Sequence, residues 1–94
     1  MQQQATSLPN FGFPWDGLIL FGMPNCPGCD QAAKYLQDRN LNFRKVRLDD
    51  APGLAQWIVE RTGQQQAPVF FYNGLYVRGG WQRTRQLVEN GTIR

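Results

Sequence analysis

Residues 18–30 read LILFGMPNCPGCD and contain the only two cysteines of the 94-residue chain, Cys26 and Cys29. The run 18–22 is apolar and ends in glycine, which is typical of a short buried strand. A helix pattern follows, and Pro27 suits its first turn because the missing N–H would be unpaired there. The residues that recur on one face of this helix are Cys29, Ala32, Ala33 and Leu36. The stretch predicts a strand and then a helix, with Cys26 just before the first turn.

The rest of the chain alternates between strand and helix signals. The segments predicted from composition and periodicity are a strand at 42–48, a helix at 51–63, a hairpin at 68–77 and a helix at about 81–90. Asn73-Gly74 tolerates the positive φ values of a type I′ hairpin turn. The charges along 42–48 suit a strand at the edge of a sheet. The expected order is β-α-β-α-β-β-α in one α/β domain.

The first seventeen residues differ in composition from the rest. They are rich in Gln, Pro and Gly and lack periodicity, so we expect a tail at 1–17, with Phe11, Phe13 and Trp15 against a domain at 18–94. The start has no basic residue and no apolar run of the kind that a secretory signal needs, and no window is apolar enough to span a membrane. Two cysteines are also too few for a disulfide-dense secreted scaffold. We expect a soluble protein in a reducing cytoplasm.

The formal net charge is +3, and its whole excess lies in residues 76–94, where four arginines oppose one glutamate. One interpretation is a solvated basic face. The other is a site that attracts a small anionic ligand or an acidic partner surface. The basic residues do not form the long stripe that nucleic-acid binding favours, so no nucleic-acid partner is expected.

Two thiols at this spacing could bind a metal, close a structural disulfide or exchange with other disulfides. Structural zinc takes four ligands, usually Cys or His, and this chain has two cysteines and no histidine. A structural disulfide closing so short a loop would remove little entropy from the unfolded chain. We therefore expect no metal and favour a redox role.

The redox hypothesis has a local physical basis. Unpaired N–H groups and the helix dipole before the first turn favour an anion at Cys26. They are expected to lower the pKa of this thiol from about 8.5 toward the range of roughly 3.5–7.5 seen in reactive cysteines. Cys26 is then the predicted nucleophile, and Cys29, one turn along the same face, would resolve the mixed disulfide.

Three separated motifs carry a resemblance to a known family. CPGC follows the first strand, QAPVFF occupies 66–71, and VRGGW occupies 77–81. In this order and spacing they resemble the glutaredoxins, over about residues 18 to 90. The resemblance implies a thioredoxin-like fold of the glutaredoxin type, with a four-stranded mixed sheet flanked by helices.

The resemblance also implies site residues. Pro68 would have a cis peptide bond and face Cys26, which leaves backbone groups of Ala67 and Val69 free to pair with an extended substrate. Val69 would then be the backbone partner of the cysteinyl part of glutathione. The paired glycines Gly79 and Gly80 would let this ligand approach closely.

Some positions depart from the family pattern. The lysine that many glutaredoxins carry shortly before the first cysteine is replaced by the run GMPN. After the glycine pair, Gln82 and Arg83 replace acidic or small polar residues. Together with Arg61 they are candidates to contact glutathione, and the arginines, with Arg85, could equally be solvated charges. Trp81 could anchor the last helix in the core or form a wall of the groove.

The predicted function is glutathione-dependent reduction of protein disulfides or glutathione mixed disulfides by a monomeric enzyme. One alternative is a glutaredoxin-like protein that thioredoxin reductase reduces and that supplies electrons to ribonucleotide reductase. A second is a carrier in which two chains and two glutathiones hold a [2Fe–2S] cluster. A third is an inert thioredoxin-like interaction module.

Overall fold

The computed structural model describes residues 8–94 and contains three helices and four strands in the predicted order. The elements are β1 (Leu18–Gly22), α1 (Pro27–Asp38), β2 (Phe43–Arg47), α2 (Pro52–Thr62), β3 (Val69–Tyr72), β4 (Leu75–Tyr76) and α3 (Gly80–Glu89). The predicted helices at 51–63 and about 81–90 and the predicted strand at 42–48 differ from these bounds by one residue at each end. The predicted hairpin at 68–77 contains β3 and β4. The prediction for residues 1–7 lies outside the described residues.

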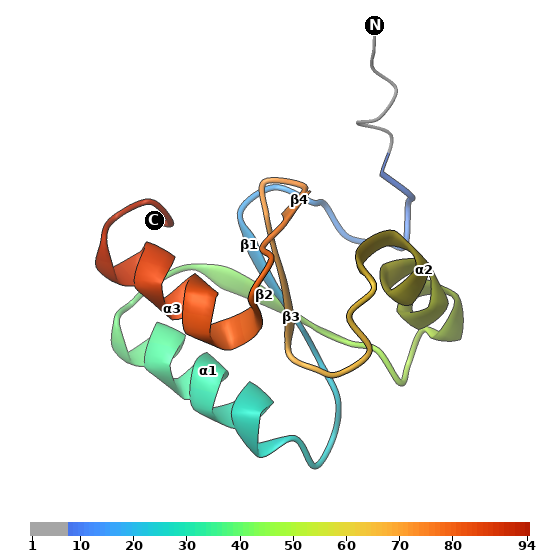
Figure 1. The fold of residues 1–94 in the computed structure, drawn as a ribbon, viewed down its shortest axis with the longest axis horizontal. Helices are drawn as coiled ribbons and strands as arrows, with labels where there is room; N and C mark the ends of the chain where they lie inside the picture. The colour runs from blue at the N-terminus through green and yellow to red at the C-terminus, as the bar shows by residue number, and fades with distance from the viewer. Residues whose placement is uncertain (1–7) are drawn as a thin grey trace, which may run out of the picture.

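The four strands form one mixed sheet in the order β2-β1-β3-β4. β1 pairs in parallel with β2 and antiparallel with β3, and β3 pairs antiparallel with β4. Every residue of β1 is buried, as expected for a central strand, and β2 lies at an edge, as its charges predict. Figure 1 shows α1 and α3 on one face of the sheet and α2 on the other.

The helix termini follow from local sequence. Cys26 is the N-cap of α1 with an extended backbone, and Pro27 opens the first turn. All four residues predicted for the inner face of α1 are buried. Gly63 ends α2 with φ of 77°, a left-handed conformation that glycine adopts without steric cost. α3 starts at Gly80, one residue before the predicted start at Trp81, and its N-cap is Gly79.

The β3–β4 turn also holds the entry to β1. Asn73 and Gly74 have φ values of 51° and 81°, as a type I′ turn requires. The Asn73 side-chain oxygen accepts a hydrogen bond from the Gly17 N–H at 2.8 Å, and the Asn73 N–H donates to the Gly17 carbonyl at 2.9 Å. Asn73 therefore fixes both the turn and the chain that leads into the central strand.

The segment before β1 packs on the α2 face of the sheet. The Trp15 ring lies 5.7 Å from that of Phe21, 5.4 Å from that of Trp57 and 5.3 Å from that of Phe71 (centroid distances). Its indole N–H donates to the Pro9 carbonyl at 2.8 Å, so the polar end of this half-buried ring is satisfied. Phe11 and Phe13 also pack against this cluster, as the sequence leads one to expect.

Candidate functional site

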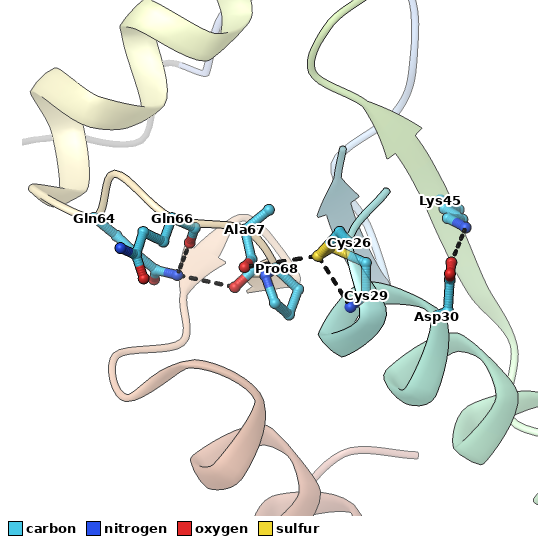
Figure 2. The surroundings of a disulfide bond; sticks show 8 residues. All are labelled: Cys26, Cys29, Asp30, Lys45, Gln64, Gln66, Ala67 and Pro68. Atoms are coloured by element: carbon cyan, nitrogen blue, oxygen red, sulfur yellow. Dashed lines mark hydrogen bonds and ion pairs between the residues drawn. A yellow bond between two sulfur atoms is a disulfide. The ribbon is translucent and has the colours of Figure 1, made fainter. Parts of the chain in front are cut away.

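The two cysteines lie at the N-terminus of α1 and form a disulfide (Figure 2). Cys26 is partly exposed, whereas Cys29 is fully buried in the core under α1. The backbone N–H of Cys29 donates to the Cys26 sulfur at 3.1 Å. A hydrogen bond from a backbone donor stabilises a sulfur anion more than a neutral thiol, because the donor's positive end points at the charge. The geometry makes Cys26 the sulfur that an external molecule can reach.

A cis peptide bond between Ala67 and Pro68 closes the opposite side of the site, as the resemblance implies. The Cys26 sulfur lies 3.9 Å from the Ala67 carbonyl oxygen (Figure 2). In the disulfide this sulfur carries no proton, so the contact can act as a hydrogen bond only in the protonated thiol. Gly28 also faces this loop, because a Cβ atom there would lie 3.7 Å from the Pro68 ring.

Of the two residues predicted to pair with a substrate through their backbone, Ala67 is the one beside the Cys26 sulfur. Val69 is only 1% exposed and lies within β3, opposite Phe21 of β1. Its assignment as the partner of a bound cysteinyl group stays a prediction. The sequence predicted the same role for both residues. In the structure they lie on either side of Pro68, and only Ala67 has a backbone group beside the Cys26 sulfur.

Gln64 holds the proline loop and was not singled out from the sequence. Its side-chain N–H₂ donates to the carbonyls of Gln66 at 2.7 Å and Pro68 at 2.8 Å (Figure 2). Its side-chain oxygen accepts from the Tyr76 hydroxyl at 2.7 Å. One amide thus ties the loop facing Cys26 to strand β4. A glutamine directly after the helix-ending Gly63 was the available signal, but one of its partners, Tyr76, lies twelve positions away on β4.

The glycine pair forms the turn into α3. Gly79 has φ of 104° and Gly80 has φ of 67°, values that residues with a side chain rarely adopt. Trp81 follows them and packs against Tyr35 and Phe70, with ring centroids 5.3 Å and 5.6 Å apart. Of the two interpretations of Trp81, the core anchor of α3 is the one that these contacts favour.

The three remaining candidates are exposed on two helices. The Arg61 guanidinium lies 5.8 Å from the Trp57 ring centroid on α2. Gln82 and Arg83 lie in α3, and an Arg83 N–H donates to the Gln86 side-chain oxygen at 3.2 Å. Their contacts with glutathione stay predictions.

One ion pair lies at the first turn of α1, where Asp30 pairs with Lys45 of β2 at 3.9 Å (Figure 2). The N-terminus of α1 supplies a field that favours an anion at Cys26. Within residues 8–94, no group of three or more His, Cys, Asp or Glu side chains is arranged to hold a metal ion. In the same part of the chain, no helix is long and apolar enough to cross a membrane.

Together these features define a thioredoxin-fold protein with a dithiol site, in which a helix N-terminus and a cis proline face each other. The sequence profile of the family described as Glutaredoxin matches residues 18–77. The chain belongs to the glutaredoxin family.

Individual relatives agree with this assignment. Mitochondrial glutaredoxin-2 of Rattus norvegicus is 29% identical over 79 residues, which cover 81% of this chain and 50% of that protein. The human protein of the same name is also 29% identical, with 48% of its length covered. The chain thus spans about half the length of the curated relatives it matches.

Solved structures confirm the fold. The crystal structure of a wheat glutaredoxin superposes with a TM-score of 0.67 at 30% identity, over 79% of this chain and 72% of the wheat chain. The solution structure of a dithiolic glutaredoxin from Trypanosoma brucei brucei superposes with a TM-score of 0.68 at 24% identity. The match covers 81% of this chain and 80% of the trypanosome chain.

Proposed function

We propose that this chain is a thiol–disulfide oxidoreductase that uses glutathione as its reductant. The observation that carries the proposal is the pair of sulfurs itself. Cys26 is accessible and receives a backbone hydrogen bond at a helix N-terminus, while Cys29 is buried one turn behind it. This arrangement divides the work between an attacking and a resolving sulfur.

In the first step the Cys26 thiolate attacks one sulfur of a substrate disulfide. A new S–S bond forms to Cys26, the substrate S–S bond breaks, and the second substrate sulfur leaves as a thiolate that takes a proton from water. The N–H of Cys29 and the other free N–H groups of the first turn stabilise the anion before the attack.

In the second step Cys29, as its thiolate, attacks the Cys26 sulfur and releases the reduced substrate. The enzyme then holds the Cys26–Cys29 disulfide seen in the structure. Two molecules of glutathione supply the two electrons and two protons that restore the dithiol, and leave as one molecule of glutathione disulfide. When the substrate is a glutathione mixed disulfide, a second glutathione can replace Cys29 in this step.

Glutathione would lie between the proline loop and the turn into α3. The Ala67 carbonyl lies beside Cys26. The backbone groups of Ala67 and Val69 would pair with an extended ligand. Gly79 and Gly80 keep the opposite wall free of side chains, and Arg61, Gln82 and Arg83 are candidates for polar contacts. This choice of ligand is supported by the crystal structure of a buckwheat glutaredoxin–glutathione complex. The buckwheat protein is 22% identical to this chain, and the two folds superpose with a TM-score of 0.69.

The partners and place of action belong to the same proposal. Disulfide-containing proteins would be the substrates, ribonucleotide reductase among them, with the chain acting as a monomer in the cytoplasm. The curated relatives are named as mitochondrial, so cell fractionation with an antibody against this chain is the direct measurement. Recovery only from organelles would contradict the cytoplasmic location.

The deciding experiment compares two electron donors on the oxidised 94-residue chain. Glutathione with glutathione reductase and NADPH is expected to reduce it rapidly, whereas thioredoxin reductase with NADPH is not. Turnover with thioredoxin reductase alone would replace glutathione as the reductant and favour the alternative family branch. Failure with both donors, while Cys26 remains accessible to alkylation after chemical reduction, would contradict the oxidoreductase assignment.

A further inference from the structure

The β4 side of the sheet carries an open groove whose lining includes neither the two cysteines nor Pro68. The groove lies between β4, α3 and the segment after α3, and encloses about 320 Å³. Its apolar floor consists of Tyr72, Val77, Leu87 and Ile93. Val77 and Ile93 are 8% and 2% exposed and belong to the core, so the floor rests on a packed part of the molecule. We call this surface the β4–α3 groove.

An exposed apolar side chain lies on the same strand. Leu75 is 73% exposed, far more than Met23 at 41% or Val59 at 37%, the other large exposed apolar residues of the described chain. Leu75 also lines the groove. β4 is the last strand of the sheet, so its outer edge has no partner strand within residues 8–94. An open strand edge beside an apolar pocket suits an extended peptide, whose backbone pairs with the strand while a side chain fills the pocket.

Two arginines without a carboxylate partner lie at this groove. Arg78 and Arg83 both line it, and neither makes an ion pair within the described residues. The Arg78 guanidinium lies 5.8 Å from the Tyr76 ring centroid, a contact that leaves its charge uncompensated. The whole positive excess of the chain lies in residues 76–94.

The basic residues of β2 provide a contrast. Lys45 pairs with Asp30, and Arg47 pairs with Asp49 and Asp50. The hydrogen bond from Arg47 also holds the pKa of the Asp49 carboxyl below its usual value. Most of the positive charge on that edge is therefore matched within the chain, whereas the charge at the groove is left for a partner.

We propose that the β4–α3 groove binds an extended segment of a partner protein in which acidic side chains flank a bulky apolar side chain. The apolar side chain occupies the floor, and the backbone follows the β4 edge. The acidic groups pair with Arg78 and with Arg83. This role for Arg83 replaces the contact with glutathione for which it was a candidate. The groove adjoins the turn into α3, since a Cβ atom on Gly79 would lie 2.8 Å from the Arg83 Cβ. Resting on the proposed function, we infer that this segment belongs to the protein whose disulfide Cys26 attacks.

The test selects peptides from a random phage-displayed library on the immobilised oxidised chain. Selected sequences are expected to combine acidic residues with a large apolar residue. Synthetic copies should bind at least about tenfold more weakly to the double variant Leu75→Ser/Arg78→Glu. Binding should also weaken with added salt, as expected for exposed charges. In ¹⁵N-labelled protein the peptides should shift the amide signals of 75–78 and of α3.

The matched control is Arg44→Glu. Arg44 is exposed on β2, away from the groove, and its substitution makes the same change in net charge. This variant should bind the peptides within about twofold of the unmodified chain, apart from a general effect of net charge. Circular dichroism of both variants checks that the fold is kept, which is expected because all three side chains are exposed.

Three outcomes would overturn the proposal. They are the recovery of no peptide, recovery of peptides without acidic residues, and equal binding to Leu75→Ser/Arg78→Glu. Turnover of bis(2-hydroxyethyl) disulfide with glutathione tests the proposed function separately, because this small molecule has no segment to place in the groove. If the peptides bind but the small disulfide is not turned over, the groove remains a peptide-binding site. The proposed function, and with it the inference that the peptide belongs to a disulfide substrate, would then be wrong.

Discussion

The packing of α1 on one face of the sheet differs from the packing on the α2 face. Under α1 the packing is close and uses small residues, among them Ala32 and Ala33. Gly22 at the end of β1 faces this helix, since a Cβ atom there would lie in ordinary contact with the Cys29 sulfur at 3.5 Å. On the α2 face the packing is aromatic, and Trp15 from the segment before β1 contacts rings from β1, β3 and α2.

This difference indicates a division of roles. Close approach of α1 places the two sulfurs at a helix N-terminus beside the proline loop, which the chemistry requires. Aromatic rings bury large areas and contribute strongly to stability, but none of those on the α2 face contacts the disulfide. Substitutions on the two faces should therefore separate activity from stability.

The largest expected effect is that of Cys26→Ser on the α1 face. It removes the attacking sulfur, so exchange with both protein disulfides and glutathione mixed disulfides should fall to the uncatalysed rate. The measurement is NADPH consumption coupled through glutathione reductase. In the reduced state the free energy of unfolding should change by less than about 1 kcal/mol, because the position is partly exposed. Residual catalysed exchange would show that Cys29 can attack by itself.

Cys29→Ser should have a selective effect. Reduction of protein disulfides should be lost, because the mixed disulfide on Cys26 has no resolving sulfur within the chain. Reduction of glutathione mixed disulfides should continue, with a second glutathione as the resolving thiol. Both reactions are followed with the same coupled assay. Equal loss of both reactions would contradict the division of roles between the two sulfurs.

Trp15→Ala tests the α2 face. Loss of this half-buried ring should lower the free energy of unfolding by about 2–3 kcal/mol, somewhat less than full burial of a Trp would give. The rate of disulfide exchange under folding conditions should stay within about twofold. Urea unfolding and the coupled assay measure the two quantities. Asp16→Asn, an exposed neighbour, serves as the control. A large loss of activity in a folded Trp15→Ala protein would show that the faces are coupled.

Tyr76→Phe has the smallest expected effect, and it tests the link between the faces. Tyr76 packs with the α2-face cluster, and its hydroxyl donates to Gln64, which holds the carbonyl of Pro68. Its removal should cost about 1 kcal/mol of stability. It should also raise KM for a glutathione mixed disulfide severalfold, while alkylation of Cys26 keeps its rate. Tyr72→Phe is the control, since its hydroxyl accepts only a long bond from Arg94 at 3.4 Å. An unchanged KM would make Gln64 a purely structural residue.

The elements of this fold could be predicted because their signals are local. The inner face of α1, the turn at Asn73-Gly74 and the end of α2 at Gly63 each depend on residues a few positions apart. The same holds for Cys26, because an N-cap is defined by the turn that follows it. The errors are single residues at helix and strand ends, where capping geometry decides the boundary.

The site beyond the two cysteines depended on contacts between distant parts of the chain. An X-Pro bond is usually trans, so composition and spacing alone could not give the cis form at Pro68, which only the family resemblance implied. The sequence allowed Trp81 to be either a core anchor or a wall of the groove. Its ring contacts with Tyr35 and Phe70 favour the core anchor. Gln64 could not be identified from the sequence, because the hydroxyl group that donates to it belongs to Tyr76, twelve positions away on β4.

By itself the sequence determined the order of elements, since each has its own local pattern. It also determined the N-cap position of Cys26 and the burial of Cys29, since one helical turn sets both. Only the tertiary structure decided which backbone group faces the sulfur. The Ala67 carbonyl lies beside Cys26 although the two residues are 41 positions apart in the chain. The sheet brings the N-terminus of α1 and the start of β3 together, because the end of β1 pairs with the start of β3. The backbone group that faces the sulfur depends on how separate elements pack together. Residues that are close in the sequence do not encode this packing.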